Sequence, residues 1–177
     1  MYKSRYHYDN SALHIAVDSL TGELLELVPA FSGENLIKNS LHDLRKPFQI
    51  YGQKAGKNHS LFGGNVYEIT RDSSLKPDIS SEELEDGGIR VTVIHSRLTD
   101  GERSYQVSVK YTMELPAGKS AVLWQMEMDN HEDGLLIEDV RFPVVQGIYM
   151  GEKWQDDALI YPLHAGLRVE NPVEVLM

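Results

Sequence analysis

The chain contains no cysteine among its 177 residues. Disulfide scaffolds, thiol nucleophiles and zinc sites built on cysteine are therefore excluded, although this absence leaves the cellular compartment open. Long apolar runs are also missing. No stretch approaches the ~20 residues needed to span a bilayer, and no apolar segment of a signal peptide follows Met1–Arg5. We therefore expect a soluble chain, with no membrane as its partner.

Basic residues are few and scattered. The chain has 17 Lys and Arg against 27 Asp and Glu, which gives a formal net charge of −10 without a long basic tract. Because phosphate binding requires clustered Lys and Arg, nucleic acid is excluded as a partner, and anionic membranes are equally unsuited. The proportions of apolar (41%) and charged (25%) residues are those of an ordinary globular domain.

Nucleotide-binding and nucleophile motifs are absent. Gly52–Asn58 (GQKAGKN) resembles a phosphate loop only superficially, since three residues instead of four separate its glycines and Asn58 follows Lys57 where Ser or Thr is required. The chain has no G-x-G-x-x-G and no G-x-S-x-G motif. The sequence therefore predicts no cofactor and assigns no catalytic residue.

Metal-ligating residues form few clusters along the sequence. None of the seven histidines is paired with another at i, i+2 or i+4, and His131 with Glu132 and Asp133 is the only local cluster. Asp129–Gly134 has the carboxylates and glycine of a calcium loop at its first, fifth and sixth positions, but the twelfth position is Val140 instead of Glu. A polar turn is favoured over a calcium site made of loop carbonyls, and no metal is predicted.

The most frequent pattern in the chain is the alternation of apolar and polar residues. In Ser104–Glu114 and in Val122–Asp129 apolar and polar residues alternate strictly, which predicts strands with one buried and one solvated face. Pro116-Ala117-Gly118 between them favours an antiparallel hairpin. Trp124 lies on the apolar face and is predicted to be a core residue. Glu127 and Asp129 share the opposite face, where contact with water is favoured over paired acid–base chemistry on a glycosidic bond.

Further strands follow the same pattern. The acidic run Ser81–Asp86 is predicted to be a solvated hairpin loop, and Pro143 places the strand before it at an edge or at its end. Glu34–Arg45 is the best helix candidate and a poor one. Further expected strands are Ala12–Asp18, Glu23–Val28, Pro47–Tyr51, Val66–Thr70, Lys76–Ser80, Gly88–Ser96 and Leu135–Val145.

About ten short strands with turns between them predict an all-β fold, an antiparallel β-sandwich with little helix. The length suits a single domain over residues 1–177. The last part of the chain, residues 146–177, mixes glycines, aromatics and short apolar pairs. We expect it to begin a linker.

Three short motifs add a family resemblance. Asp18 and Thr21-Gly22, at the turn of the first hairpin, resemble a D-x-x-T-G-x-L motif that opens the N-terminal sandwich domains of sugar-processing enzymes. Asn130 followed by Ile137, Val140 and Phe142-Pro143 is similar to N-…-I-x-x-V-x-F-P, and Tyr161–Gly166 to the P-x-x-x-G that comes after it. Together they resemble the galactose-mutarotase-like β-supersandwich, a domain that precedes a (β/α)-barrel in several glycoside hydrolases.

The resemblance implies a non-catalytic N-terminal domain of a glycoside hydrolase, which packs against a barrel in the same polypeptide and helps to shape its active site. Carbohydrate is the implied ligand, with Trp154, Tyr161 and His164 as candidate contacts. Trp154, in a polar setting, suits a sugar-stacking platform or a wedge against a neighbouring domain. This leaves two alternatives: a free-standing carbohydrate-binding module that uses Trp154, or a small mutarotase or epimerase. The catalytic His and Glu of a mutarotase match no position here.

Overall fold

The structure is a computed structural model that describes residues 5–37, 46–54, 66–145, 147–148, 158–161 and 167–170. Throughout these residues the regular elements are β-strands, and none is a helix, which confirms the predicted all-β class. It follows that no helix among the described residues is long and apolar enough to cross a membrane. Most of Glu34–Arg45, the helix candidate, lies outside the described residues.

The first sheet is an antiparallel meander of three strands in the order β1-β2-β3. The expected hairpin is present, and the amide of Gly22 donates to the carbonyl of Asp18 at 2.8 Å in its turn. β1 was not expected, because its sequence RYHYD is polar and the strand is almost wholly exposed. The strands are β1 (Arg5–Asp9), β2 (Leu13–Asp18) and β3 (Leu24–Pro29).

The second sheet has four antiparallel strands in the order β11-β10-β7-β6. The predicted central hairpin is confirmed, with Met113 opposite Trp124 and Lys110 opposite Glu127. The strands are β6 (Asp78–Glu83), β7 (Ile89–His95), β10 (Val107–Leu115) and β11 (Leu123–Asn130).

Two boundaries in this region differ from prediction. The acidic run is not all loop, because Ser81–Glu83 continue β6 opposite Ile89–Val91, and Arg90 binds Glu82 at 2.8 Å. The alternating run at Ser104–Glu114 is not one strand either. It divides at Gln106, and its first two residues pair in another sheet. In both cases the boundary of the strand is set by pairing with a neighbouring strand. The local sequence pattern does not contain this information.

The third sheet joins distant parts of the chain in the order β12-β4-β5-β8-β9. β12 is its edge strand and ends just before Phe142-Pro143, as Pro143 predicts. Asp100-Gly101 forms the turn between β8 and β9, with Gly101 at a φ of 93°. The strands are β4 (Gln49–Lys54), β5 (Tyr67–Arg71), β8 (Leu98–Thr99), β9 (Ser104–Tyr105) and β12 (Leu135–Arg141).

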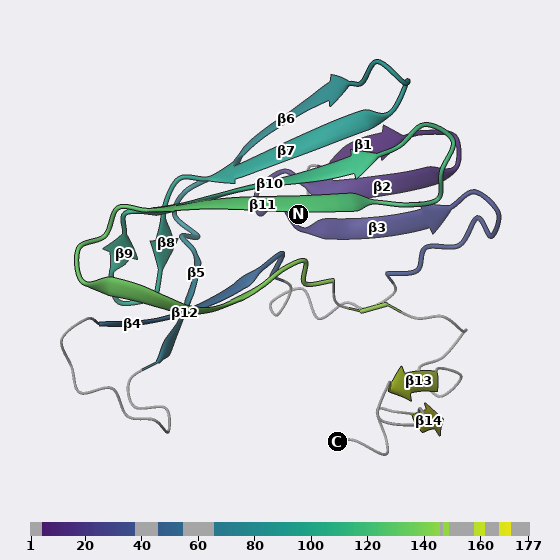
Figure 1. Ribbon diagram of the computed structural model, residues 1–177. Coiled ribbons are helices and arrows are strands. Elements are labelled where there is room, and N and C mark those ends of the chain that lie inside the picture. Colours follow the sequence, from purple (N-terminus) through teal and green to yellow (C-terminus); the bar gives the residue numbers. More distant parts are fainter. Residues whose placement is uncertain are drawn as a thin grey trace.

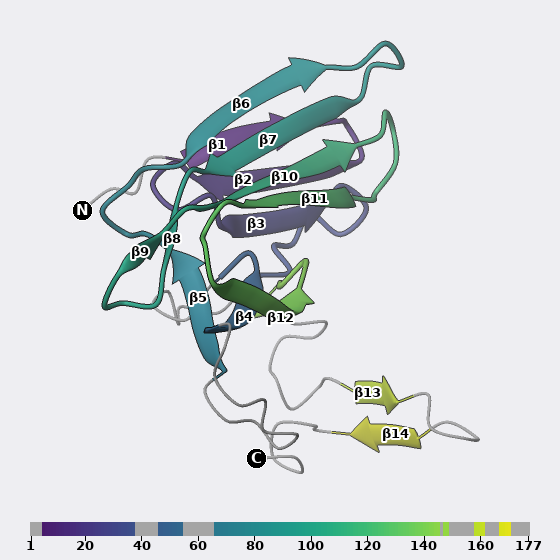
Figure 2. The same cartoon turned by 60° about the vertical axis from the view of Figure 1, so that its left-hand side comes forward.

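The first and second sheets face each other and form the sandwich, and the third lies across one end (Figure 1; Figure 2). All three contribute to one core, which includes Ile15 of β2, Val93 of β7, Tyr111 of β10 and Ile69 of β5. Along β10 buried and half-buried residues alternate without a break, as expected for a central strand with one face in the core. A further hairpin, β13 (Ala158–Tyr161) with β14 (Leu167–Glu170), forms a separate two-stranded sheet.

Candidate functional site

An apolar groove of about 270 Å³ runs along one edge of the sandwich, where β3 and β11 lie side by side (Figure 1; Figure 2). Each of these strands is the last one of its sheet, so no further strand closes the gap between the two layers. The walls come from β3, from the start of β11 and from the segment after β12, and include Leu24, Leu27, Val122, Trp124, Val145 and Ile148.

The burial pattern shows why this edge is open. On β10 the inward residues are fully buried, but on β11 the inward residues Trp124, Met126 and Met128 are only half-buried. Trp124 packs on Phe142 with ring centroids 5.7 Å apart and on Tyr111 at 6.4 Å. It is therefore attached to the core as predicted, yet it keeps one side in the groove, because β11 has a neighbour on one side only.

The groove wall is almost wholly apolar. Among its lining residues Ser120 carries a hydroxyl, which donates to the carbonyl of Ala12 at 2.9 Å, and Trp124 carries an indole N–H; the other lining side chains are apolar. Neither histidine nor a carboxylate lines the groove. Because sugars are bound through several hydrogen bonds in addition to stacking, these walls suit an apolar protein surface better than a glycan.

The residues predicted to contact sugar lie mainly outside the described part of the chain. This is the case for Trp154 and His164. Tyr161 is the last residue of β13, where its backbone pairs with Leu167 of β14. The role of these three residues in binding carbohydrate stays a prediction.

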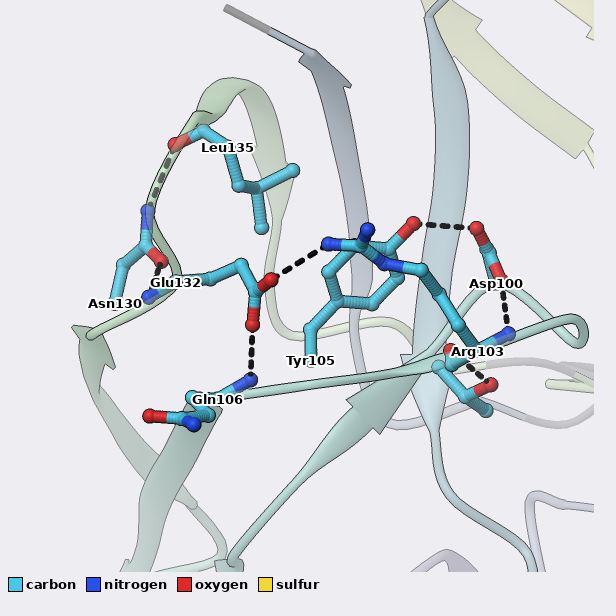
Figure 3. A network of polar contacts seen from close by, with 8 residues as sticks. Asp100, Arg103, Tyr105, Gln106, Asn130, Glu132 and Leu135 are labelled. Atoms are coloured by element: carbon cyan, nitrogen blue, oxygen red, sulfur yellow. Dashed lines mark hydrogen bonds and ion pairs between the residues drawn. The ribbon is translucent and has the colours of Figure 1, made fainter.

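The loop Asp129–Gly134, which carries part of the calcium pattern, joins β11 to β12 and is held by a network of polar contacts (Figure 3). The carboxylate of Glu132 accepts hydrogen bonds from the Arg103 guanidinium at 2.6 Å and from the Gln106 amide at 2.9 Å. The side-chain amide of Asn130 donates to the carbonyl of Leu135 at 3.0 Å. Both oxygens of Glu132 thus accept from protein donors, and they connect this loop to Arg103 and Gln106.

The second half of this network is built on Asp100 and Tyr105. The Tyr105 hydroxyl donates to the Asp100 carboxylate, and the Arg103 guanidinium lies 4.4 Å from the centre of the Tyr105 ring. Burial, followed by the hydrogen bond to Asp100, raises the pKa of Tyr105 well above its ordinary value. The hydroxyl therefore stays protonated, and the contacts support a structural role for this end of the third sheet.

Glu127 and Asp129 face water on β11, as predicted. Both are exposed, and Glu127 forms an ion pair with Lys110 at 3.1 Å across the β10–β11 ladder. A glycosidase acid needs a walled site that raises the pKa of one carboxyl group. Nothing encloses these two carboxylates, so they do not form such a site.

A set of titratable groups that the sequence did not bring together is buried between the two layers. The Tyr111 hydroxyl donates to the carbonyl of Gly22 at 2.6 Å, and the His95 ring stacks on Tyr111 with centroids 6.0 Å apart. Burial, followed by the positive charge of Arg71, lowers the pKa of His95 to about 4. Burial raises the pKa of Tyr111. Both groups are therefore neutral near pH 7.

This inner cluster lies within the core, because Tyr111 and His95 are only 1% and 4% exposed. No substrate reaches groups so enclosed, and their role is to pack the sandwich. The groove, by contrast, is open and lined mainly by apolar side chains. Comparison with models of known protein families gives no match, and a search among curated proteins finds no relative.

Proposed function

We propose that this β-sandwich is a non-catalytic domain of a carbohydrate-active enzyme, which packs through its groove against a catalytic barrel of the same polypeptide and helps to shape the active site. The observation that carries the proposal is the apolar groove at the open β3–β11 edge. The class of enzyme comes from the motif resemblance at Asp18–Leu24, Asn130–Pro143 and Tyr161–Gly166.

The chemistry of the groove favours a protein surface as its occupant. In a chain of net charge −10, an apolar wall at a sheet edge is expected to be covered, because exposed apolar area costs about 25 cal/mol per Å². Ile148, at 42% exposed, is a large apolar side chain of this wall that is open to solvent. A barrel whose outer helices present apolar side chains supplies the matching surface.

The path of the chain favours a partner on the same polypeptide. Val145 and Ile148, which follow β12, form part of the wall, and Ile148 makes a backbone bridge to Ile37. A domain that follows these residues is tethered beside the groove, and a short tether gives an effective concentration of about millimolar. At this effective concentration even an interface of modest affinity is occupied.

Cysteine labelling tests the packing, because the chain has no cysteine of its own. Ile148→Cys and Leu75→Cys introduce thiols at positions of similar exposure, 42% and 39%, the second lying outside the groove. In the isolated chain both are expected to react rapidly with a maleimide. In the polypeptide extended through its catalytic domain, Ile148→Cys is expected to react at least tenfold more slowly and Leu75→Cys at an unchanged rate. Equal labelling of both in the extended protein, or a stop codon directly after Met177, would overturn the proposal.

A second experiment tests the non-catalytic assignment. The isolated chain is expected to release no nitrophenol from a panel of aryl glycosides, whereas the extended polypeptide hydrolyses at least one of them. Robust turnover by the isolated chain contradicts the assignment. A change in tryptophan fluorescence on adding glycans, lost in Trp154→Ala, supports the carbohydrate-binding module instead.

A further inference from the structure

Two histidines that are seven residues apart in sequence face each other on the outer surface of the three-stranded sheet. In the strand register His7 lies opposite Ala16, and His14 lies opposite Asp9. Ala16 in turn lies opposite Glu26 of β3. Paired residues share a face of a sheet, so β1, β2 and β3 each contribute a metal-ligating side chain to one patch.

Ala16 lies at the centre of this patch. It stands between His7 and Glu26 in the register, and it is fully buried although its neighbours Ile15 and Val17 point to the opposite, core-facing side. The larger side chains around it therefore converge above a small residue. Because alanine is small, the side chains of His7 and His14 approach each other closely beside it, with ring centroids 5.3 Å apart.

The ligand atoms already have the spacing of a coordination sphere. Nδ1 of His7 lies 3.2 Å from Nε2 of His14, which lies 3.7 Å from Oε2 of Glu26, and one ligand atom from each residue falls within 4.8 Å of the others. Around a tetrahedral zinc ion with bonds of 2.0–2.1 Å, neighbouring ligand atoms are about 3.3 Å apart. Small movements of the side chains bring all three within bonding distance of one ion.

Charged groups lie beside two of these ligands. Oδ2 of Asp9 lies 3.6 Å from Nδ1 of His14, on the far side of the ring from His7 and Glu26. At this distance the carboxylate forms no hydrogen bond with the ring, but it adds negative charge beside the ligand. Arg5 binds Oε1 of Glu26 and leaves Oε2 for His14. With Asp9 and Glu26 negative and Arg5 positive, the patch carries a net charge of −1, which favours a cation.

We propose that His7, His14 and Glu26 bind a divalent transition-metal ion, of which Zn²⁺ is the best match. Two imidazoles and a carboxylate are ligands that zinc accepts, and three protein ligands leave a fourth position for water. Because the ligands come from three strands, the ion fastens the exposed strand β1 to the rest of the sheet. The site is independent of the groove and of the proposed role in a carbohydrate-active enzyme.

Calorimetric titration of the metal-free 177-residue chain with ZnCl₂ at pH 7.5 tests the proposal. We expect one ion per chain and, at a hundredfold excess over Kd, a rise in Tm of roughly 5–10 °C. His7→Ala and His14→Ala are expected to weaken binding at least tenfold each, because each variant removes one of the three protein ligands. His131→Ala, which removes an exposed histidine near two carboxylates, is the matched control and leaves the affinity unchanged.

Imidazole NMR of the unsubstituted chain gives a second measurement that does not depend on the folding of a variant. Added Zn²⁺ is expected to shift the ring signals of His7 and His14 and to leave that of the buried His95 in place. Absence of binding at millimolar Zn²⁺ overturns the proposal, and so does binding that both His→Ala variants retain in full.

Discussion

At the scale of single residues, the contact between Gly22 and Tyr111 explains why glycine occupies the first hairpin turn. Gly22 has a φ of 75°, and a Cβ placed there would lie 2.7 Å from the Tyr111 hydroxyl and 2.7 Å from Cγ1 of Val93. Glycine is therefore required here for two reasons: the backbone conformation of the turn and the close approach of the second sheet. The hydroxyl that occupies this space is the one that binds the Gly22 carbonyl.

We expect Gly22→Ala to lower the free energy of unfolding by about 1–3 kcal/mol more than Gly33→Ala. Gly33 has a similar φ of 65° but nothing within 4 Å of its added Cβ, so it reports the backbone strain alone. Urea unfolding of both variants measures the difference. Equal losses would show that the contact with Tyr111 relaxes without cost.

His95 is expected to make stability depend on pH. Its pKa is lowered from 6.5 to about 4, by burial and then by Arg71. Because the folded-state pKa lies below the unfolded-state value, the stability it contributes is complete above pH 6.5 and is lost as the pH falls toward 4. A lowering of this size corresponds to roughly 3 kcal/mol at most.

Urea unfolding at pH 7 and at pH 4.5 measures this contribution. The loss of unfolding free energy between the two pH values is expected to be smaller in His95→Leu than in the unsubstituted protein, whereas the exposed control His131→Ala behaves like the unsubstituted protein. If His95→Leu loses as much stability on acidification as the parent, protonation of His95 is not the cause.

At the scale of elements, Asn10 joins the two layers of the sandwich. Its side-chain amide donates to the carbonyls of Pro116 and Lys119 in the turn of the β10–β11 hairpin, and its side-chain oxygen accepts from the amides of Ala12 and Leu13. One buried side chain thus satisfies four backbone groups of two hairpins. Buried backbone groups left without partners cost about 1–3 kcal/mol each.

Asn10→Ala is therefore expected to lower the free energy of unfolding by about 2–4 kcal/mol. Asn10→Asp separates the two halves of the contact, because it keeps the acceptor for Ala12 and Leu13 but loses the donor to the second hairpin. We expect it to be as destabilising as Asn10→Ala above pH 5. Thermal unfolding of both variants checks this, and a loss under 0.5 kcal/mol in each would exclude a joining role.

At the scale of the whole molecule, the sandwich is closed at its centre and open at its edge. β10 has paired neighbours on both sides and buries every second residue, while β1 is an edge strand with exposed side chains. Stability is expected to follow this gradient, since local opening is easiest where few apolar contacts must be broken.

Native-state hydrogen exchange measures the gradient. The amides of Val109 and Tyr111 in β10 are expected to exchange at least about 100-fold more slowly than those of Tyr6 and Tyr8 in β1. Saturating Zn²⁺ is expected to slow exchange in β1 and to leave β10 unchanged. Uniform protection across the four residues would contradict a graded structure.

Much of the architecture could be predicted from the local sequence pattern. Strict alternation in the central hairpin and turn chemistry at Asp18–Gly22 predicted the strands of the sandwich, because side-chain period and turn conformation depend on neighbouring residues. β1 was not predicted, because a polar edge strand buries too few side chains to show an alternation of apolar and polar residues. The end of β6 was misplaced because its limit depends on pairing with β7.

The candidate sites, in contrast, depend on the tertiary structure more than on local sequence pattern. The sequence by itself determined the all-β class, an edge position or an end for the strand before Pro143, and the acidity of the chain. The tertiary structure alone decided that His7, His14 and Glu26 meet, that His95 lies against Tyr111, and that β3 and β11 leave an apolar groove between them. The physical reason is that strand register and layer packing bring together residues far apart in the chain, and neither is encoded in the spacing of residues along it.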